Sequence, residues 1–321
     1  TRSSAIIASI GFDRDCEYFA TAGVNNRIRV QSDRPDSRSL TDDGLLPHYY
    51  PTYELTCRNK ISCLSWNPYV KSLIANSDYT GVVTLWDAHT GVETLTWSEH
   101  AKRIWSLDFS RTDPNRLASG GDDTKVKIWC MRQSQSALTL DGRANVCCVQ
   151  FNPTVSHCLA LGTADHHIYY YDLRNPNTPV TTLKGHRKAV SFVRFINGRE
   201  LVSASIDNTL THGIPESNPL GIGQRTYRGH TNEKNFVGLS VRNDWITCGS
   251  ETNCVFTYHR ALSQPVFRTP FDQELPSTTN QVLPTPTNPA TPSFVSAVCW
   301  KPDADVLLAA SSHGTIRTFH L

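Results

Sequence analysis

Basic and aromatic side chains recur at matched positions along this chain. Lys60 and Arg103 lie 43 residues apart, which is also the separation between Trp86 and Trp129. Further candidates at similar positions are the basic residues Lys188 and Lys234 and the ring-bearing residues Tyr79, Trp105, His166 and Phe236. If the fold brings these residues together, the rings would form the floor of a depression and the basic groups would form its walls. Such a depression suits a short peptide with an apolar centre and acidic flanks.

Other site chemistry finds little support. Ten cysteines and twelve histidines are present, but no C-x-x-C pair occurs, so we expect no metal site. Cys63, Cys148 and Cys299 lie inside apolar runs, and we interpret them as reduced, buried thiols of a nuclear and cytoplasmic protein. No nucleophile motif or phosphate-binding loop appears. We therefore expect a binding protein without a cofactor and not an enzyme.

The composition of the chain limits the classes of partner that it could bind. The 321 residues carry a formal net charge of +2 and no basic stripe, so nucleic acid is an unlikely ligand. No apolar run is long enough to span a bilayer, and the first residues lack the apolar core of a signal peptide. Short peptides or proteins remain the favoured partners.

The elements that must position these residues form a repeat. Six short apolar runs end on an aromatic residue, and a seventh, weaker run ends on valine. They are 8–12, 63–66, 106–109, 148–151, 192–195, 297–300 and, weaker, 238–241. The middle runs end at 66, 109, 151, 195 and 241, in steps of 43, 42, 44 and 46. A period in the forties is typical of β-propeller blades. We therefore predict an all-β, seven-bladed propeller occupying 1–321 as a single domain.

Blade three is the clearest copy and resembles WD repeats. In that family a His, a Ser or Thr, an Asp and a Trp form a buried hydrogen-bond chain, which the resemblance places at His100, Ser119, Asp123 and Trp129. The alternative is a catalytic His–Asp pair. We favour the structural role, because a buried His and Asp are stable only when they satisfy each other.

Some segments depart from the pattern. Blade five should be irregular around 211–224, where Gly213, Pro215 and Pro219 oppose a central strand. A Pro-rich stretch, 270–292, is expected to be a flexible surface loop, with a docking ligand as the alternative. The last strand leaves its blade one strand short. Residues 1–6 barely supply it, so we expect the parent protein to continue upstream.

Several strings are more specific than the repeat. They are EHAKRIWS at 99–106, ADHH at 164–167, YYDLRN at 170–175, GHRKAVS at 185–191 and GHTNEKNFVGL at 229–239. Together they resemble the C-terminal propeller of the constitutive photomorphogenesis RING-type ubiquitin ligases, with the suppressor-of-phytochrome-A proteins as close relatives. That propeller is the family's substrate receptor, and the RING module lies upstream of it.

The resemblance implies a peptide pocket. By carry-over it comprises Lys60, Tyr79, Arg103, Trp105, His166, Lys188, Glu233 and Phe236. Its ligands would be Val-Pro motifs preceded by acidic residues, in transcription factors, photoreceptors or pseudokinase adaptors. Asp172 and Arg174 resemble a box that docks onto the cullin-4 adaptor, or they form a local ion pair. Suppressor-type proteins are further implied partners. The rival interpretations are a scaffold without a pocket and a single-stranded nucleic-acid binder.

Overall fold

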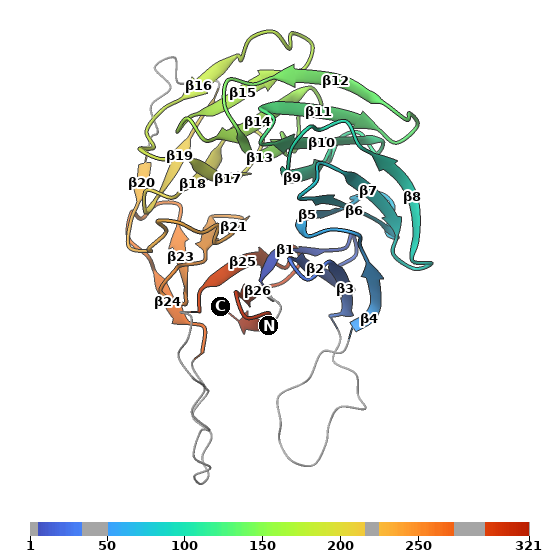
Figure 1. The fold of residues 1–321 in the computed structure, drawn as a ribbon. Helices are drawn as coiled ribbons and strands as arrows, with labels where there is room; N and C mark the ends of the chain where they lie inside the picture. Colours follow the sequence, from blue (N-terminus) through green and yellow to red (C-terminus); the bar gives the residue numbers. More distant parts are fainter. Residues whose placement is uncertain (1–5, 34–50, 216–224, 273–292, 321) are drawn as a thin grey trace, which may run out of the picture.

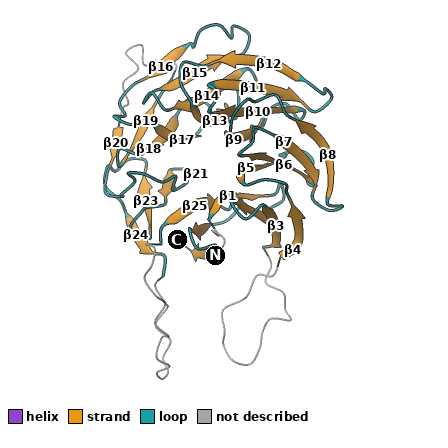
Figure 2. Cartoon of the chain, viewed as in Figure 1, coloured by secondary structure: helices purple, strands orange, loops and turns teal. Residues whose placement is uncertain are grey.

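The protein is a closed ring of antiparallel sheets. The computed structural model describes residues 6–33, 51–215, 225–272 and 293–320. These residues form seven sheets arranged around a central axis (Figure 1). Strands and loops account for all of the described chain, with no helix in it (Figure 2). The predicted seven-bladed all-β propeller is confirmed.

Each blade runs outward from an inner strand. Blade one contains β1 (Ile7–Phe12), β2 (Tyr18–Gly23), β3 (Arg27–Ser32) and β4 (Pro51–Thr56). Blade two contains β5 (Ile61–Trp66), β6 (Leu73–Asp78), β7 (Val83–Asp87) and β8 (Val92–Trp97). Blade three contains β9 (Ile104–Phe109), β10 (Arg116–Gly121), β11 (Lys125–Cys130) and β12 (Ser136–Asp141). Blade four contains β13 (Val146–Phe151), β14 (Cys158–Thr163), β15 (Ile168–Asp172) and β16 (Thr181–Leu183).

The remaining blades follow the same order. Blade five contains β17 (Val190–Phe195), β18 (Leu201–Ser205), β19 (Thr209–Gly213) and β20 (Arg225–Tyr227). Blade six contains β21 (Leu239–Arg242), β22 (Trp245–Cys248), β23 (Cys254–His259) and β24 (Phe267–Pro270). Blade seven contains β25 (Val295–Trp300), β26 (Val306–Ser311) and β27 (Ile316–His320). A fourth strand for blade seven is expected from residues 1–6, of which 1–5 lie outside the described range.

Apolar residues of neighbouring blades pack face to face, as strand alternation requires. Between blades two and three, Leu85, Leu107 and Phe109 are buried in one cluster with two tryptophans. These are Trp97 and Trp129, whose rings stack with centroids 5.2 Å apart. Burial of such large side chains between sheets is the main stabilising contribution of this architecture.

Inner strands are also joined by side chains. The Ser9 and Ser106 hydroxyls accept hydrogen bonds from the backbone N–H groups of Leu64 and Val149 in the next blades, at 3.2 and 3.1 Å. Where the first and last blades meet, the Ser296 hydroxyl donates to the Ile7 carbonyl at 2.7 Å. These bonds satisfy buried groups on both sides and hold the ring closed.

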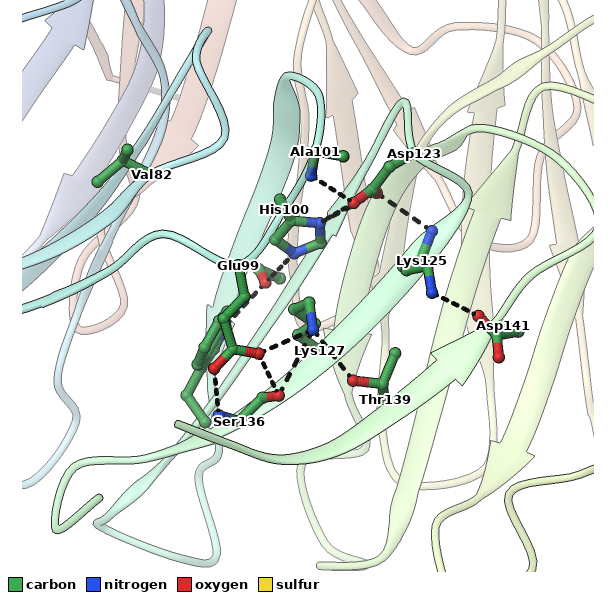
Figure 3. A network of polar contacts seen from close by, with 12 residues as sticks. Val82, Glu99, His100, Ala101, Asp123, Lys125, Lys127, Ser136, Thr139 and Asp141 are labelled. Atoms are coloured by element: carbon green, nitrogen blue, oxygen red, sulfur yellow. Dashed lines mark hydrogen bonds and ion pairs between the residues drawn. The ribbon is translucent and has the colours of Figure 1, made fainter. Parts of the chain in front are cut away.

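Blade three contains the hydrogen-bond chain that the WD-repeat resemblance implies (Figure 3). The Asp123 carboxylate lies 2.8 Å from Nδ1 of His100, and the Ser119 hydroxyl lies 2.7 Å from Nε2. Trp129 donates its indole N–H to Ser119 at 2.8 Å. Burial lowers the pKa of His100 in spite of the Asp123 charge, which keeps the imidazole neutral. The His100 side chain is 0% exposed and both of its ring nitrogens have hydrogen-bond partners, which supports the structural role over a catalytic His–Asp pair.

Two expectations for irregular segments need correction. Residues 211–213 belong to β19, which pairs with β18 along its whole length. A strand forms because Pro215 lies beyond the pairing and so removes no ladder hydrogen bond. Pro270 ends β24, an edge strand, and Phe271 is buried against blade seven. The rest of both stretches, 216–224 and 273–292, lies outside the described residues.

All ten cysteines are free thiols, and seven of them are buried. Of the three that the sequence analysis expected to be buried, Cys148 is buried, whereas Cys63 and Cys299 are half-buried. Burial raises the pKa of Cys57 to about 12. Within the described residues, no group of His, Cys, Asp or Glu could hold a metal ion. The same residues include no helix long and apolar enough to cross a membrane.

His230 in blade six should make folding sensitive to acid. Burial lowers its pKa to about 4, against about 6.5 in an unfolded chain. The unfolded state therefore binds the extra proton between these values, and the unfolding free energy falls as the pH drops through this window. We expect a loss of about 2 kcal/mol from His230 by about pH 4.5. Urea titrations at two pH values should show a smaller pH effect in His230→Gln, and an identical effect would contradict the assignment.

Candidate functional site

The eight predicted pocket residues lie at one rim of the ring. The first strand of each blade starts at this rim, and antiparallel pairing returns the chain there between the second and third strands. Lys60, Arg103 and Lys188 precede β5, β9 and β17, and Tyr79 and His166 follow β6 and β14. Glu233 and Phe236 precede β21, and Trp105 is the second residue of β9. The topology thus gathers side chains from blades two to six around the axis.

Lys60 and Arg103 occupy equivalent positions, as the spacing predicts. The Lys60 carbonyl accepts a hydrogen bond from the Tyr79 N–H at 3.0 Å, and the Arg103 carbonyl accepts one from the Asp122 N–H at 2.8 Å. In blade five the matching hydrogen bond runs from the Ile206 N–H to the Ala189 carbonyl, at 3.3 Å. Lys188 therefore lies one residue before the position that is equivalent to Lys60 and Arg103. The offset places Lys188 one residue further from the inner strand than its two counterparts.

A turn with one left-handed residue recurs beside the rim in every blade. The non-glycine members are Asn26, Thr124, His166, Asn208 and Asn253, with φ between 54° and 74°. Glycines take this position in blades two and seven, as Gly81 and Gly314. Gly and Asn favour this conformation and His adopts it more readily than most residues, so this turn position suits the exposed His166, whereas the β-branched Thr124 is unusual there.

Trp105 lies at a β-bulge. The ladder joins Gly121 to Ile104 and Gly120 to Ser106, which leaves Trp105 without a paired residue. Such a bulge redirects a side chain away from the regular alternation. Its indole N–H donates to the Asp122 carboxylate at 2.8 Å, and the Asn145 amide donates to the same oxygen at 3.2 Å. The ring is therefore oriented before any ligand arrives.

Four predicted residues meet in direct contact. The Trp105 ring centroid lies 5.0 Å from that of Phe236 and 6.0 Å from that of Tyr79. The Arg103 guanidinium carbon lies 4.4 Å from the Tyr79 ring and 4.7 Å from the Trp105 ring. Cation–π contact fixes this guanidinium between two rings. Among the described residues no carboxylate pairs with Arg103, and its Nε is buried without a hydrogen-bond partner.

The other four predicted residues lie at the same rim in exposed positions. They are Lys60, His166, Lys188 and Glu233. Phe192 was missed by the sequence reasoning, although its centroid lies 5.8 Å from that of Phe236. The sequence does not single out Phe192 because it occupies an inner-strand position, where an aromatic residue is normally interpreted as part of the hydrophobic core. Tyr79, Trp105, Phe236 and Phe192 are called the aromatic cluster below.

Asp172 and Arg174 form the local ion pair that was one of two interpretations. The Arg174 guanidinium bonds the Asp172 carboxylate at 2.6 Å, and this contact holds the pKa of Asp172 at about 2. Arg174 remains 69% exposed at the corner of blade four. Docking of a cullin-4 adaptor at this corner stays a prediction.

Comparison with known proteins identifies the family. The WD domain, G-beta repeat model matches residues 91–130, 177–211 and 283–320. The WD repeat-containing protein RUP2 of Arabidopsis thaliana is 34% identical over 342 residues, covering 99% of this chain and 88% of that protein. The chain belongs to the WD-repeat family.

This WD-repeat propeller is related to ubiquitin ligases. It is 48% identical over 320 residues to the E3 ubiquitin-protein ligase COP1 of Pisum sativum, covering 99% of the chain and 45% of that protein. Protein SPA1-RELATED 4 of Arabidopsis thaliana is 44% identical over 322 residues, covering 99% of the chain and 39% of that protein. The chain spans less than half the length of these two relatives. The resemblance inferred from the sequence strings is confirmed.

Proposed function

We propose that this WD-repeat propeller is a substrate receptor that binds short peptides carrying a Val-Pro pair preceded by acidic residues. The observation that supports this most directly is the aromatic cluster with the unpaired Arg103 guanidinium above it. The rings offer an apolar seat, while Arg103 and the exposed Lys60 and Lys188 offer charge to an acidic flank. Proline in the ligand reduces the ordering cost of binding, because its φ is already fixed.

The relatives suggest what binding achieves. The Pisum sativum relative is named an E3 ubiquitin-protein ligase, and this chain aligns with part of it. Under our proposal the propeller holds a target protein of the nucleus or cytoplasm while other parts of a ligase transfer ubiquitin. The chain's own task is recognition.

Isothermal titration with two peptides tests the proposal. One peptide carries acidic residues followed by Val-Pro, and its control carries Ala-Ala in place of Val-Pro. We expect saturable binding of the first and none of the second. Equal binding of both, or binding of single-stranded DNA in preference to either, would contradict the proposed function. DNA affinity would also show a steep logarithmic dependence on salt.

Arg103→Glu should selectively weaken peptides with acidic flanks. The change reverses the charge above the cluster, so we expect about a tenfold loss of affinity at low salt and a smaller loss at high salt. Lys60→Glu and Lys188→Glu should act in the same direction but less, because both residues are exposed. Arg132→Glu on the outer part of blade three is the matched control for net charge. If Arg132→Glu weakens binding as much, the effect comes from overall charge and not from the pocket.

A further inference from the structure

The segment 228–238, which carries Glu233 and Phe236, contains no strand. It connects β20 to β21 and is longer than the connections into the inner strands of blades two to five. Those connections into inner strands are 57–60, 98–103, 142–145 and 184–189. Without ladder hydrogen bonds, its backbone N–H groups need other partners. Whatever supplies those partners determines where the Phe236 ring lies.

Glu251, in the turn between β22 and β23, supplies the partners closest to Phe236. Its Oε1 accepts hydrogen bonds from the backbone N–H groups of Lys234 at 2.8 Å and Asn235 at 2.7 Å. The Asn235 side-chain amide donates to the same oxygen at 3.1 Å. Burial acts to raise the pKa of Glu251, but backbone hydrogen bonds from Asn235, Lys234 and Glu233 lower it overall. The carboxylate is therefore ionised at neutral pH, and its hydrogen bonds are charge-assisted.

Asn208 holds the same segment from blade five. It occupies the left-handed turn position between β18 and β19, with φ 67°. Its Oδ1 accepts from the Asn232 N–H at 2.5 Å, and its Nδ2 donates to Oε1 of Glu233 at 3.3 Å. Asn208 thus orients a predicted pocket side chain directly. Two blades grip adjacent residues, 232–233 from one side and 234–235 from the other.

These contacts end one residue before Phe236. That ring closes the aromatic cluster, with centroids 5.0 Å from Trp105 and 5.8 Å from Phe192. We propose that Asn208 and Glu251 are positioning residues, which hold 232–235 so that Phe236 meets Trp105 and Glu233 faces the peptide. The choice of ligand in this inference rests on the proposed function. The positioning of Phe236 by Asn208 and Glu251 also applies to the free protein. Preorganisation of this kind lowers the cost of binding.

The test compares Glu251→Ala, Glu251→Gln and Asn208→Gly. Glycine keeps the left-handed turn unstrained while removing both Asn208 hydrogen bonds. Glu99→Ala is the matched control, because Glu99 also accepts from a backbone N–H, at 2.8 Å, but that N–H belongs to Ser136, the first residue of the outer strand of blade three (Figure 3). Each protein carries 5-fluorotryptophan, and the Trp105 fluorine resonance is assigned by its loss in Trp105→Phe.

We expect Glu251→Ala to shift the Trp105 resonance of the free protein and to weaken the Val-Pro peptide about tenfold, as loss of about 1.4 kcal/mol of preorganisation would. Glu251→Gln retains the accepting oxygen and should recover most of both effects. Asn208→Gly should weaken binding about threefold, and Glu99→Ala should change neither readout.

Several results would overturn the inference. An unchanged resonance and affinity in folded Glu251→Ala would do so, as would an equal shift in Glu99→Ala. If Glu251→Ala does not fold, Asn208→Gly and Glu251→Gln decide by the same criteria. If the parent binds no Val-Pro peptide, the proposed function fails alone. The resonance shift in the free protein then still decides whether Asn208 and Glu251 position Phe236.

Discussion

Trp105→Ala should reduce the affinity for an acidic Val-Pro peptide by at least about 2 kcal/mol, or roughly thirtyfold. The ring lies at the centre of the aromatic cluster, in contact with Tyr79, Phe236 and the Arg103 guanidinium. Its removal would take away part of the apolar seat and one of the two rings that orient Arg103. Tyr79→Ala and Phe236→Ala should follow with smaller losses, because Tyr79 contacts only one other ring of the cluster and Phe236 does not contact Arg103, whereas Trp105 contacts two rings and the Arg103 guanidinium.

Titration calorimetry on folded protein measures this effect. Trp245→Ala is the matched control, because Trp245 is also a partly buried tryptophan but starts β22 at the opposite rim, against His259 and Phe267. We expect its peptide affinity to equal that of the parent. An unchanged dissociation constant in Trp105→Ala would remove the pocket and favour a scaffold without one.

The rim could be predicted because the inner strands repeat. Once Trp86 and Trp129 were aligned, Lys60 and Arg103 followed, and their matched carbonyl contacts confirm the register. Phe192 could not be predicted in the same way. Phe192 follows the bulged residue of β17 and occupies the register position of Ser106 in β9, so no aromatic counterpart in that blade marks the position.

Blade five shows a different limit. Its His186 lies 2.7 Å from the Ser203 hydroxyl and 3.2 Å from the Asp207 carboxylate, so most of the blade-three chain is present. The residue that matches Trp129 in register is Gly213, and without the tryptophan the sequence pattern is lost. Leu183 fills part of the space, since a Cβ added at Gly213 would lie 3.1 Å from its Cδ1. A side chain from another blade that fills the space of a missing tryptophan cannot be predicted from the local sequence.

The anchors of the 228–238 segment were also beyond sequence reasoning. Glu251 and Asn208 lie in turns, where a polar residue has an ordinary solvent-exposed interpretation. Only the fold brings the Glu251 carboxylate to the N–H groups of Lys234 and Asn235. Side chains that bind a ligand can be predicted from their residue types, such as aromatic and basic residues at matched positions. Side chains that hold a backbone segment in place show no such preference for residue type.

His100→Ala should lower the free energy of unfolding by about 3 kcal/mol without changing peptide affinity. The imidazole links Ser119 to Asp123, whose side chain is 5% exposed, so its loss leaves two buried polar groups without their partner. Asp123→Ala should cost a similar amount, since it leaves Nδ1 of the buried His100 without a partner and also removes the bonds from the backbone N–H groups of Ala101 and Lys125.

Urea unfolding followed by tryptophan fluorescence measures this loss, and titration well below the unfolding transition measures affinity. His166→Ala is the matched control, because it also removes an imidazole but at an exposed rim position, so its stability should lie within about 0.5 kcal/mol of the parent. The two histidines should therefore behave oppositely. His100 stabilises the fold, whereas His166 is a side chain of the proposed binding rim and does not stabilise the fold. A His100→Ala protein as stable as the parent but deficient in peptide binding would reverse these assignments, and would place the chemistry of this propeller inside blade three.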